Sequence, residues 1–163
     1  MTKIDALESV FDHVIAEEAF ELARPTILEL IRTRVAKRKD LHVLVARRVS
    51  AEEFLDYGSR SFGDKKKWMF AYKDIAESKR DITVRTGLPS REAQLLHSEL
   101  LCTHDTKYWG SWIEGNIVVA VSGADAWVDE MIAKIVVAII KGLIQARIER
   151  NKAEFPASDF YQP

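Results

Sequence analysis

The chain has 163 residues, a length that suits one domain, and 47% of them are hydrophobic, which excludes wholesale disorder. Its 24 basic and 25 acidic residues nearly cancel, so bulk electrostatics argue against a protein that binds polyanions. A single cysteine, Cys102, excludes an intrachain disulfide, and neither a signal peptide nor a membrane-spanning run is visible, so we expect a cytoplasmic protein with no membrane partner.

The first half of the chain predicts a long helix followed by two strands. In "DLHVLVARRV", Leu41, Val43 and Val45 alternate with His42 and Leu44, which is the pattern of a strand with two apolar faces. The expected elements are a short helix at 3–9, an extended segment at 10–15, a helix at 16–38 with Pro25 in an early turn or at a kink, strands at 40–49 and 52–58, and a polar loop at 59–67.

The second half predicts two helices, a hairpin and a final long helix. Gly87 and Pro89 in "GLPS" are typical of a helix end, and "EGN" is typical of a turn between strands. The expected elements are helices at 68–86 and 90–101, strands at 107–113 and 116–123, and a helix at 124–150. Hairpin-linked strands with helices predict an antiparallel sheet in an α/β (α+β) fold, with one domain at 1–150 and a tail at 151–163.

Lys79 lies where the helical pattern of 68–86 calls for an apolar residue. The apolar face repeats at steps of four and three through Tyr72, Ile75, Lys79 and Ile82. A buried ammonium costs several kcal/mol unless it is paired. We therefore expect a buried Lys79 stem whose ammonium meets a carboxylate, backbone carbonyls or an anionic ligand. The alternative is a lysine whose stem packs while its head reaches water.

Three side chains in "HSELLCTH" are candidate ligands of a metal or of haem iron. His97, Cys102 and His104 offer soft nitrogen and sulfur atoms. Their spacing matches no established zinc pattern, and a fourth ligand is not evident. The alternative is a loop with two exposed histidines and a buried structural thiol.

The start of the final helix, "SGADAWVDE", could bind an anion with its free amides. Ser122 and Asp125 have the spacing of a capping box instead, and Asp125, Asp129 and Glu130 complement the helix dipole. We therefore favour a structural role for this segment.

Short basic runs do not indicate a nucleic-acid interface. "KRK" at 37–39 and "KKK" at 65–67 have no interleaved aromatic residues of the kind that stack on bases. The sequence contains no familiar catalytic or nucleotide-binding motif, and no pair of carboxylates stands out for acid–base work. Whether the protein is an enzyme stays open at this point.

Two stretches resemble a known family. "DIAESKRDITVRTGLPSRE" and "GSWIEGNIVVAVSGADAWVDEMIAKIVVAII" resemble the GlcG/HbpS-like haem-binding and haem-degrading domain family. A less characterised branch of that family is more similar still, through matches at Trp68, Lys79, Arg80, Val84, Arg85 and Ser90. The glycine-rich stretch of the family is replaced here by "YWGSWI", which keeps only Gly110.

The resemblance covers about residues 11–146 and carries several implications. It implies a profilin-like domain with an antiparallel sheet of about five strands between helices, and a homo-oligomer. It also implies a small ligand, with haem or a related tetrapyrrole as candidates and Lys79, Arg80, Arg85 and Ser90 as ligand-binding residues. The leading hypothesis is a ligand-binding or sensor-like domain; the alternative is a non-catalytic assembly or interaction protein without a small-molecule site.

Self-association is also expected from the apolar pattern. Trp109 and Trp112 are predicted in one strand, which sends residues of opposite parity to opposite faces. Apolar residues spread around more than one stripe of the final helix, which therefore needs two surfaces to pack against. We expect the second surface to come from another copy of the chain.

Overall fold

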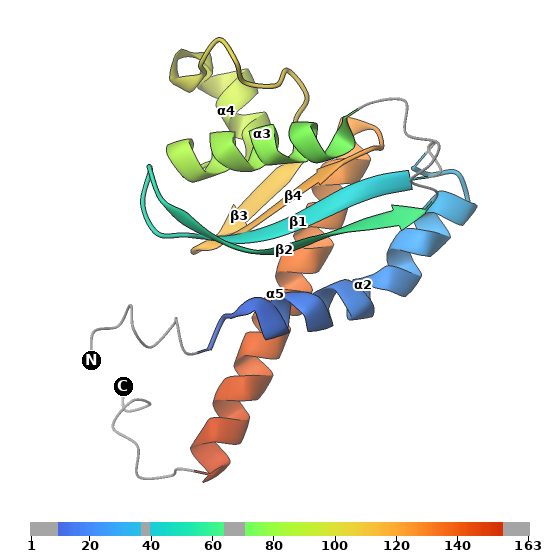
Figure 1. The fold of residues 1–163 in the computed structure, drawn as a ribbon, viewed down its shortest axis with the longest axis vertical. Coiled ribbons are helices and arrows are strands. Elements are labelled where there is room, and N and C mark those ends of the chain that lie inside the picture. Colours follow the sequence, from blue (N-terminus) through green and yellow to red (C-terminus); the bar gives the residue numbers. More distant parts are fainter. Residues whose placement is uncertain (1–9, 37–39, 64–70, 155–163) are drawn as a thin grey trace.

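The structure, a computed structural model, describes residues 10–36, 40–63 and 71–154. These residues form a single α+β domain in which a four-stranded antiparallel sheet packs against four α-helices (Figure 1). In chain order the elements are α2 (His13–Arg32), β1 (Asp40–Arg48), β2 (Phe54–Gly63), α3 (Tyr72–Thr86), α4 (Ser90–Leu96), the 3-10 helix η2 (Ser98–Leu100), β3 (Ser111–Glu114), β4 (Ile117–Ser122) and α5 (Ala126–Glu154).

The strand order in the sheet is β2-β1-β4-β3, and every neighbouring pair is antiparallel. Hairpins join β1 to β2 and β3 to β4, while β1 and β4 pair across the centre with Val43 opposite Val121. The pairing register of β1 with β2 shifts between Val45 and Ala46, so β2 carries an irregularity at this point. The predicted antiparallel α+β fold is confirmed.

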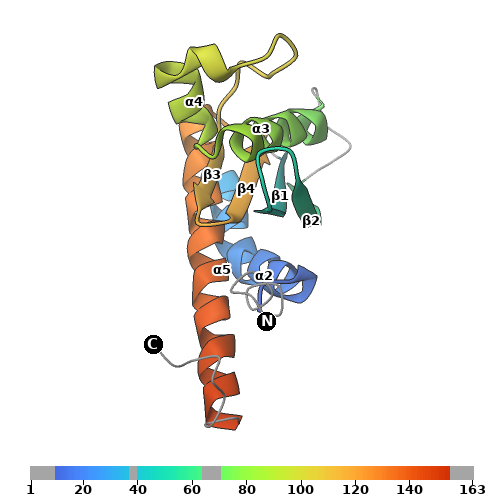
Figure 2. The same cartoon turned by 90° about the vertical axis from the view of Figure 1, so that its left-hand side faces the viewer.

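Helices cover both faces of the sheet, as its two apolar faces require. α3 lies over one face and α2 under the other, and α5 runs past both layers at the β3 side (Figures 1 and 2). The larger core lies on the α2 and α5 side, where Val43, Val45, Val119 and Val121 meet both helices. Smaller clusters on the α3 side include Leu44 with Ala76.

The N-terminal predictions need three corrections. The expected strand at 10–15 is wrong, because Asp12 caps α2: its Oδ1 accepts a hydrogen bond from the Ile15 amide at 3.0 Å, and the helix begins at His13. The sheet of the described residues therefore has four strands instead of about five. α2 ends at Arg32 and not at residue 38, and Pro25 lies inside it and not in an early turn. The other expectation, a kink at Pro25, stays a prediction. The expected helix at 3–9 lies outside the described residues.

Boundaries elsewhere also differ from the predictions. β2 runs to Gly63, so the first half of the predicted polar loop is strand. Phe62 packs into the core, and Ser61 on the other face forms a hydrogen bond of 2.9 Å with His42 of β1. The helix predicted at 68–86 is described from Tyr72 and the one at 90–101 ends at Leu96, while residues 107–110 precede β3. α5 begins at Ala126 and continues to Glu154, four residues past the predicted domain boundary. The rest of the expected tail lies outside the described residues.

Much of the apolar surface around α5 is covered within one chain. Val136, Val137 and Ile140 are fully buried in the core shared with α2 and the sheet. α2 thus supplies a second packing surface within the same chain, although Met131, Ile139 and Leu143 are only partly buried. Self-association stays a prediction. No described helix has the length and apolarity needed to cross a membrane.

A candidate small-molecule pocket around Lys79

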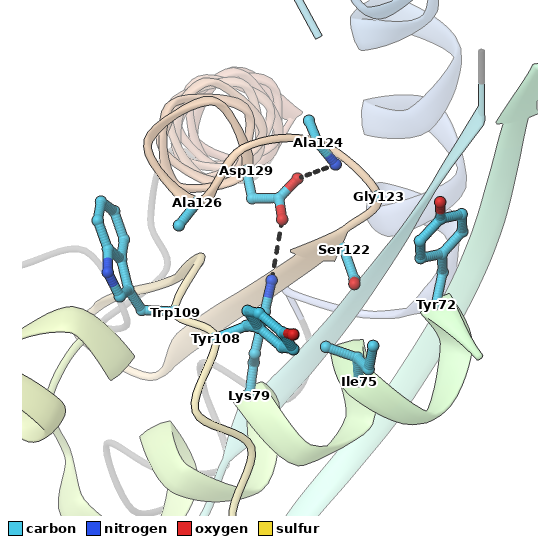
Figure 3. A pocket seen from close by; sticks show the side chains of 10 residues that line it. All are labelled: Tyr72, Ile75, Lys79, Tyr108, Trp109, Ser122, Gly123, Ala124, Ala126 and Asp129. Carbon is cyan, nitrogen blue, oxygen red and sulfur yellow. Dashed lines mark hydrogen bonds and ion pairs between the residues drawn. The ribbon is translucent and has the colours of Figure 1, made fainter. Parts of the chain in front are cut away.

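Three elements meet at the candidate site. α3 carries Lys79 over the sheet, β4 ends beneath it at Ser122, and the first turn of α5 brings Asp129 to the same place (Figure 3). α3 ends as predicted at Gly87, which adopts the left-handed conformation and donates its amide to Thr83. Asp125, and not Ser122, lies at the start of α5, since its carbonyl accepts from the Val128 and Asp129 amides. Asp125 therefore takes the position predicted for Ser122, and the predicted capping box is wrong.

Lys79 is buried and paired. Its side chain is 1% exposed, and its Nζ donates to Asp129 Oδ2 at 2.9 Å and to the carbonyl of Val121 at 2.7 Å. The second oxygen of Asp129 accepts from the Ala124 amide at 3.0 Å. The expectation that a buried Lys79 meets a carboxylate and a carbonyl is confirmed, and this pairing explains why a lysine can stand in an apolar stripe.

Burial shifts both members of the pair toward their neutral forms. Desolvation raises the pKa of Asp129 to about 6, although Lys79 and the Ala124 and Gly123 amides act to lower it. Desolvation likewise lowers the pKa of Lys79, against the opposing attraction of Asp129. The electrostatic cost of the two charges is therefore only partly offset by their mutual attraction.

Gly110 lets the chain pass close to this pair. It has a φ of +143°, and a Cβ at this position would lie 2.5 Å from Asp129 Cβ and 3.0 Å from Lys79 Nζ. Ser90 fixes the same loop, because its Oγ accepts from the Gly110 and Ser111 amides at 3.0 and 3.1 Å. Gly110 is the residue that the resemblance retained from a glycine-rich stretch, and its role here is steric.

A pocket opens beside the ion pair, with a cavity volume of about 140 Å³. Its walls combine aromatic and aliphatic side chains with a few polar groups, and Lys79 and Asp129 lie in the middle of them (Figure 3). Tyr108 is 51% exposed, so one wall of the pocket borders solvent. The lining residues are Tyr72, Ile75, Lys79, Tyr108, Trp109, Ser122, Gly123, Ala124, Ala126 and Asp129.

Of the four predicted ligand-binding residues, Lys79 alone lines this pocket. Arg80 stacks on the Phe54 ring, with 4.2 Å between its guanidinium carbon and the ring centroid, and forms an ion pair with Asp81. Arg85 forms an ion pair with Asp105 in the segment before β3. Ser90 supports the pocket indirectly through Gly110, as described above. A ligand-binding role for these three stays a prediction that the pocket does not support.

The structure does not assemble His97, Cys102 and His104 into a metal centre. His97 hydrogen-bonds Glu99 at 3.2 Å, and both Cys102 and His104 are exposed. Within 10–36, 40–63 and 71–154, no group of three or more His, Cys, Asp or Glu could hold a metal ion. The alternative of a buried thiol is also wrong. A role for one of the three as an axial haem ligand stays a prediction.

Comparison of the chain with family models, curated proteins and solved structures gives no significant match. The resemblance to the GlcG/HbpS family therefore rests on the quoted stretches alone. Functional inference has to start from the pocket.

Sequence reasoning missed two features of this site. Asp129 was assigned to the dipole of the final helix, whereas it turns inward to Lys79, fifty residues away along the chain. Trp109 was expected in a strand, whereas it precedes β3 and lines the pocket with Tyr108. The unpaired lysine in the α3 pattern signalled that a partner was needed, but no local pattern identifies a partner contributed by another helix.

Proposed function

We propose that this protein binds a small, neutral and largely apolar molecule that presents a hydrogen-bond acceptor to Lys79. The observation that supports this most is a buried ammonium at the wall of an apolar pocket. An ammonium has three donors, and two are used by Asp129 and Val121. In this proposal the third donates to a ligand oxygen.

Charge favours a neutral ligand over an anion. Lys79 and Asp129 neutralise each other, and Asp129 also accepts a hydrogen bond from the Ala124 amide next to the start of α5. A ligand carboxylate at this point would share one lysine with Asp129 and would add a like charge in a poorly solvated place. A carbonyl or amide oxygen can accept from Lys79 without that repulsion.

The pocket volume limits the size of the ligand. About 140 Å³ is close to the roughly 150 Å³ of an engineered apolar cavity that binds benzene. A molecule with one six-membered ring and a short polar substituent fits that volume. A tetrapyrrole is far larger, so this volume alone cannot enclose haem.

A titration with acetophenone or benzamide, followed by amide chemical shifts, tests the proposal. Fragments of this size bind with a Kd of about 1 mM, and the Gly123 and Ala124 amides should shift on binding. Ala126→Leu fills the pocket and should abolish these shifts. Ala138→Leu is the matched control, because Ala138 lies on the exposed side of the same helix. Equal shifts in wild type and Ala126→Leu would contradict the proposal.

Haem is tested separately. If one of His97, Cys102 or His104 ligates iron, hemin should bind at about one equivalent per chain, and substitution of that residue by alanine should move the Soret band. Identical spectra for the wild type and the variants would exclude these ligands.

A second candidate function is an interaction protein that assembles through apolar side chains. Leu95 and Leu96 on α4 are 67% and 71% exposed, and Trp127 on α5 is 54% exposed. The ion pair between Arg91 and Glu130 joins these two helices. Large exposed apolar groups are typical of association surfaces. These exposed side chains support a homo-oligomer. From the sequence and the family resemblance we also propose that it is cytoplasmic and has a profilin-like arrangement of the GlcG/HbpS type.

A further inference from the structure

Lys79 is the amine among the side chains that line the pocket, and its surroundings differ from those of the described surface lysines. Its Nζ lies 2.9 Å from the Asp129 carboxylate, and its side chain is 1% exposed. The side chain of Lys73, on the same helix, is 60% exposed. A carboxylate at this distance can accept the proton that the ammonium must lose before the amine can react as a nucleophile.

We infer that Lys79 captures small apolar aldehydes as a reversible imine, with Asp129 as the proton carrier. The inference rests on the proposed function, because the aldehyde must first occupy the same pocket. It goes further in assigning a covalent reaction and a substrate class to it.

Each step of the reaction can be written with the groups present. Asp129 takes a proton from the Lys79 ammonium, and the free amine pair forms a C–N bond to the aldehyde carbon while the C=O π pair moves to oxygen. A proton moves from nitrogen to that oxygen, which gives a carbinolamine. Asp129 then returns its proton to the hydroxyl, the C–O bond breaks, water leaves, and the nitrogen pair closes the C=N bond.

The charges at the start and the end of this reaction are the same. The site begins as an ammonium beside a carboxylate and ends as an iminium beside the same carboxylate. No net charge is created in a poorly solvated place, where an unpaired charge would be costly. The burial that lowers the pKa of Lys79 and raises that of Asp129 also makes the initial proton transfer between them easier.

The pocket walls indicate which aldehydes react. Ile75, Tyr108 and Trp109 offer apolar and aromatic surface near Lys79 (Figure 3). A benzaldehyde-sized molecule can place its ring against these side chains with its carbonyl toward Nζ. Water-soluble, charged aldehydes such as glyoxylate should react poorly, because their carboxylate would meet Asp129.

The test is reductive trapping with benzaldehyde and sodium cyanoborohydride at limiting aldehyde, followed by peptide mapping of the wild-type protein. Because pocket binding holds the reactants together, Lys79 should acquire a benzyl group at least about ten times faster than Lys73. Excess acetophenone and the Ala126→Leu substitution should each remove this preference, and Ala138→Leu should retain it. Mapping the wild type avoids dependence on a Lys79 variant that fails to fold.

Benzylation of Lys79 no faster than that of Lys73 would overturn the inference. The titration with acetophenone separates this failure from failure of the binding proposal. Amide shifts at Gly123 and Ala124 without preferential trapping would leave the binding site valid and remove the imine. The absence of both would remove both.

Discussion

Removing the charges of Lys79 and Asp129 separately and together tests whether the pair is coupled. Lys79→Met leaves a buried carboxylate without its cation, and Asp129→Asn leaves a buried ammonium with one carbonyl partner. Breaking a buried pair from one side costs about 3–5 kcal/mol. Asparagine can still accept from the Ala124 amide through Oδ1, so this substitution acts mainly through the charge.

The double variant should cost much less than the sum of the two single variants. It leaves the Val121 carbonyl without its lysine donor and the asparagine NH₂ without a partner, which together cost about 2–3 kcal/mol. With single costs of about 3 kcal/mol each, the coupling free energy is about 3 kcal/mol or more.

Urea unfolding followed by tryptophan fluorescence and circular dichroism at pH 7 measures these free energies. The control cycle uses the pair Lys141–Glu114, whose side chains are 55% and 39% exposed, with the substitutions Lys141→Met and Glu114→Gln. An exposed pair of this kind should couple by about 0–1 kcal/mol. Additive costs for Lys79→Met and Asp129→Asn, within about 0.5 kcal/mol, would refute the reasoning.

Further outcomes follow from the same site. Because Lys79 lowers the pKa of Asp129, Lys79→Met should raise the pKa of Asp129 above about 6. The stability lost in that variant should return as the pH falls toward 3.8, the pKa of the aspartate in the unfolded chain. Urea unfolding at pH 5 and pH 7.5 that shows no such recovery would contradict this. Gly110→Ala should lower the free energy of unfolding by more than about 2 kcal/mol, because its Cβ meets Asp129, whereas Gly142→Ala in the open part of α5 should raise it by about 1 kcal/mol. Ser90→Ala removes the acceptor of two buried amides and should lower the free energy of unfolding by about 2 kcal/mol, measured by thermal or urea unfolding. An unchanged unfolding midpoint would contradict this expectation. Light scattering at micromolar concentration should give a mass above 18.6 kDa, and a mass of one chain would exclude the homo-oligomer.

Much of the fold could be predicted from the sequence because its signals are local. The alternation in β1 and β4, the turn at Gly115 and the exit of α3 at Gly87 each follow from a few neighbouring residues. The prediction for 10–15 failed because the side chain of Asp12 caps a helix that begins at His13. The second half of β2 was not predicted, because most residues after Gly58 are polar. β2 is an edge strand of the described sheet, and an edge strand can carry polar groups on its open side.

The site was less predictable, because its parts come from distant places in the chain. Lys79 was recognised from its place in an apolar face, and its need for a partner followed from electrostatics alone. The identity of that partner depends on how α5 starts after β4, and the pocket depends on where Trp109 and Tyr108 lie once Ser90 holds their loop. Neither is encoded by spacing along the sequence.

The ion pair also joins parts of the domain that the sheet would otherwise keep apart. Lys79 belongs to the helix over one face, whereas α5 packs with α2 and the other face of the sheet, and the two helices meet where β4 ends. Local opening of α3 would therefore expose the Asp129 charge at the start of α5 without its cation. The two helical layers should for this reason exchange their amide protons as one cooperative unit at this end of the sheet, and not as two independently fraying helices.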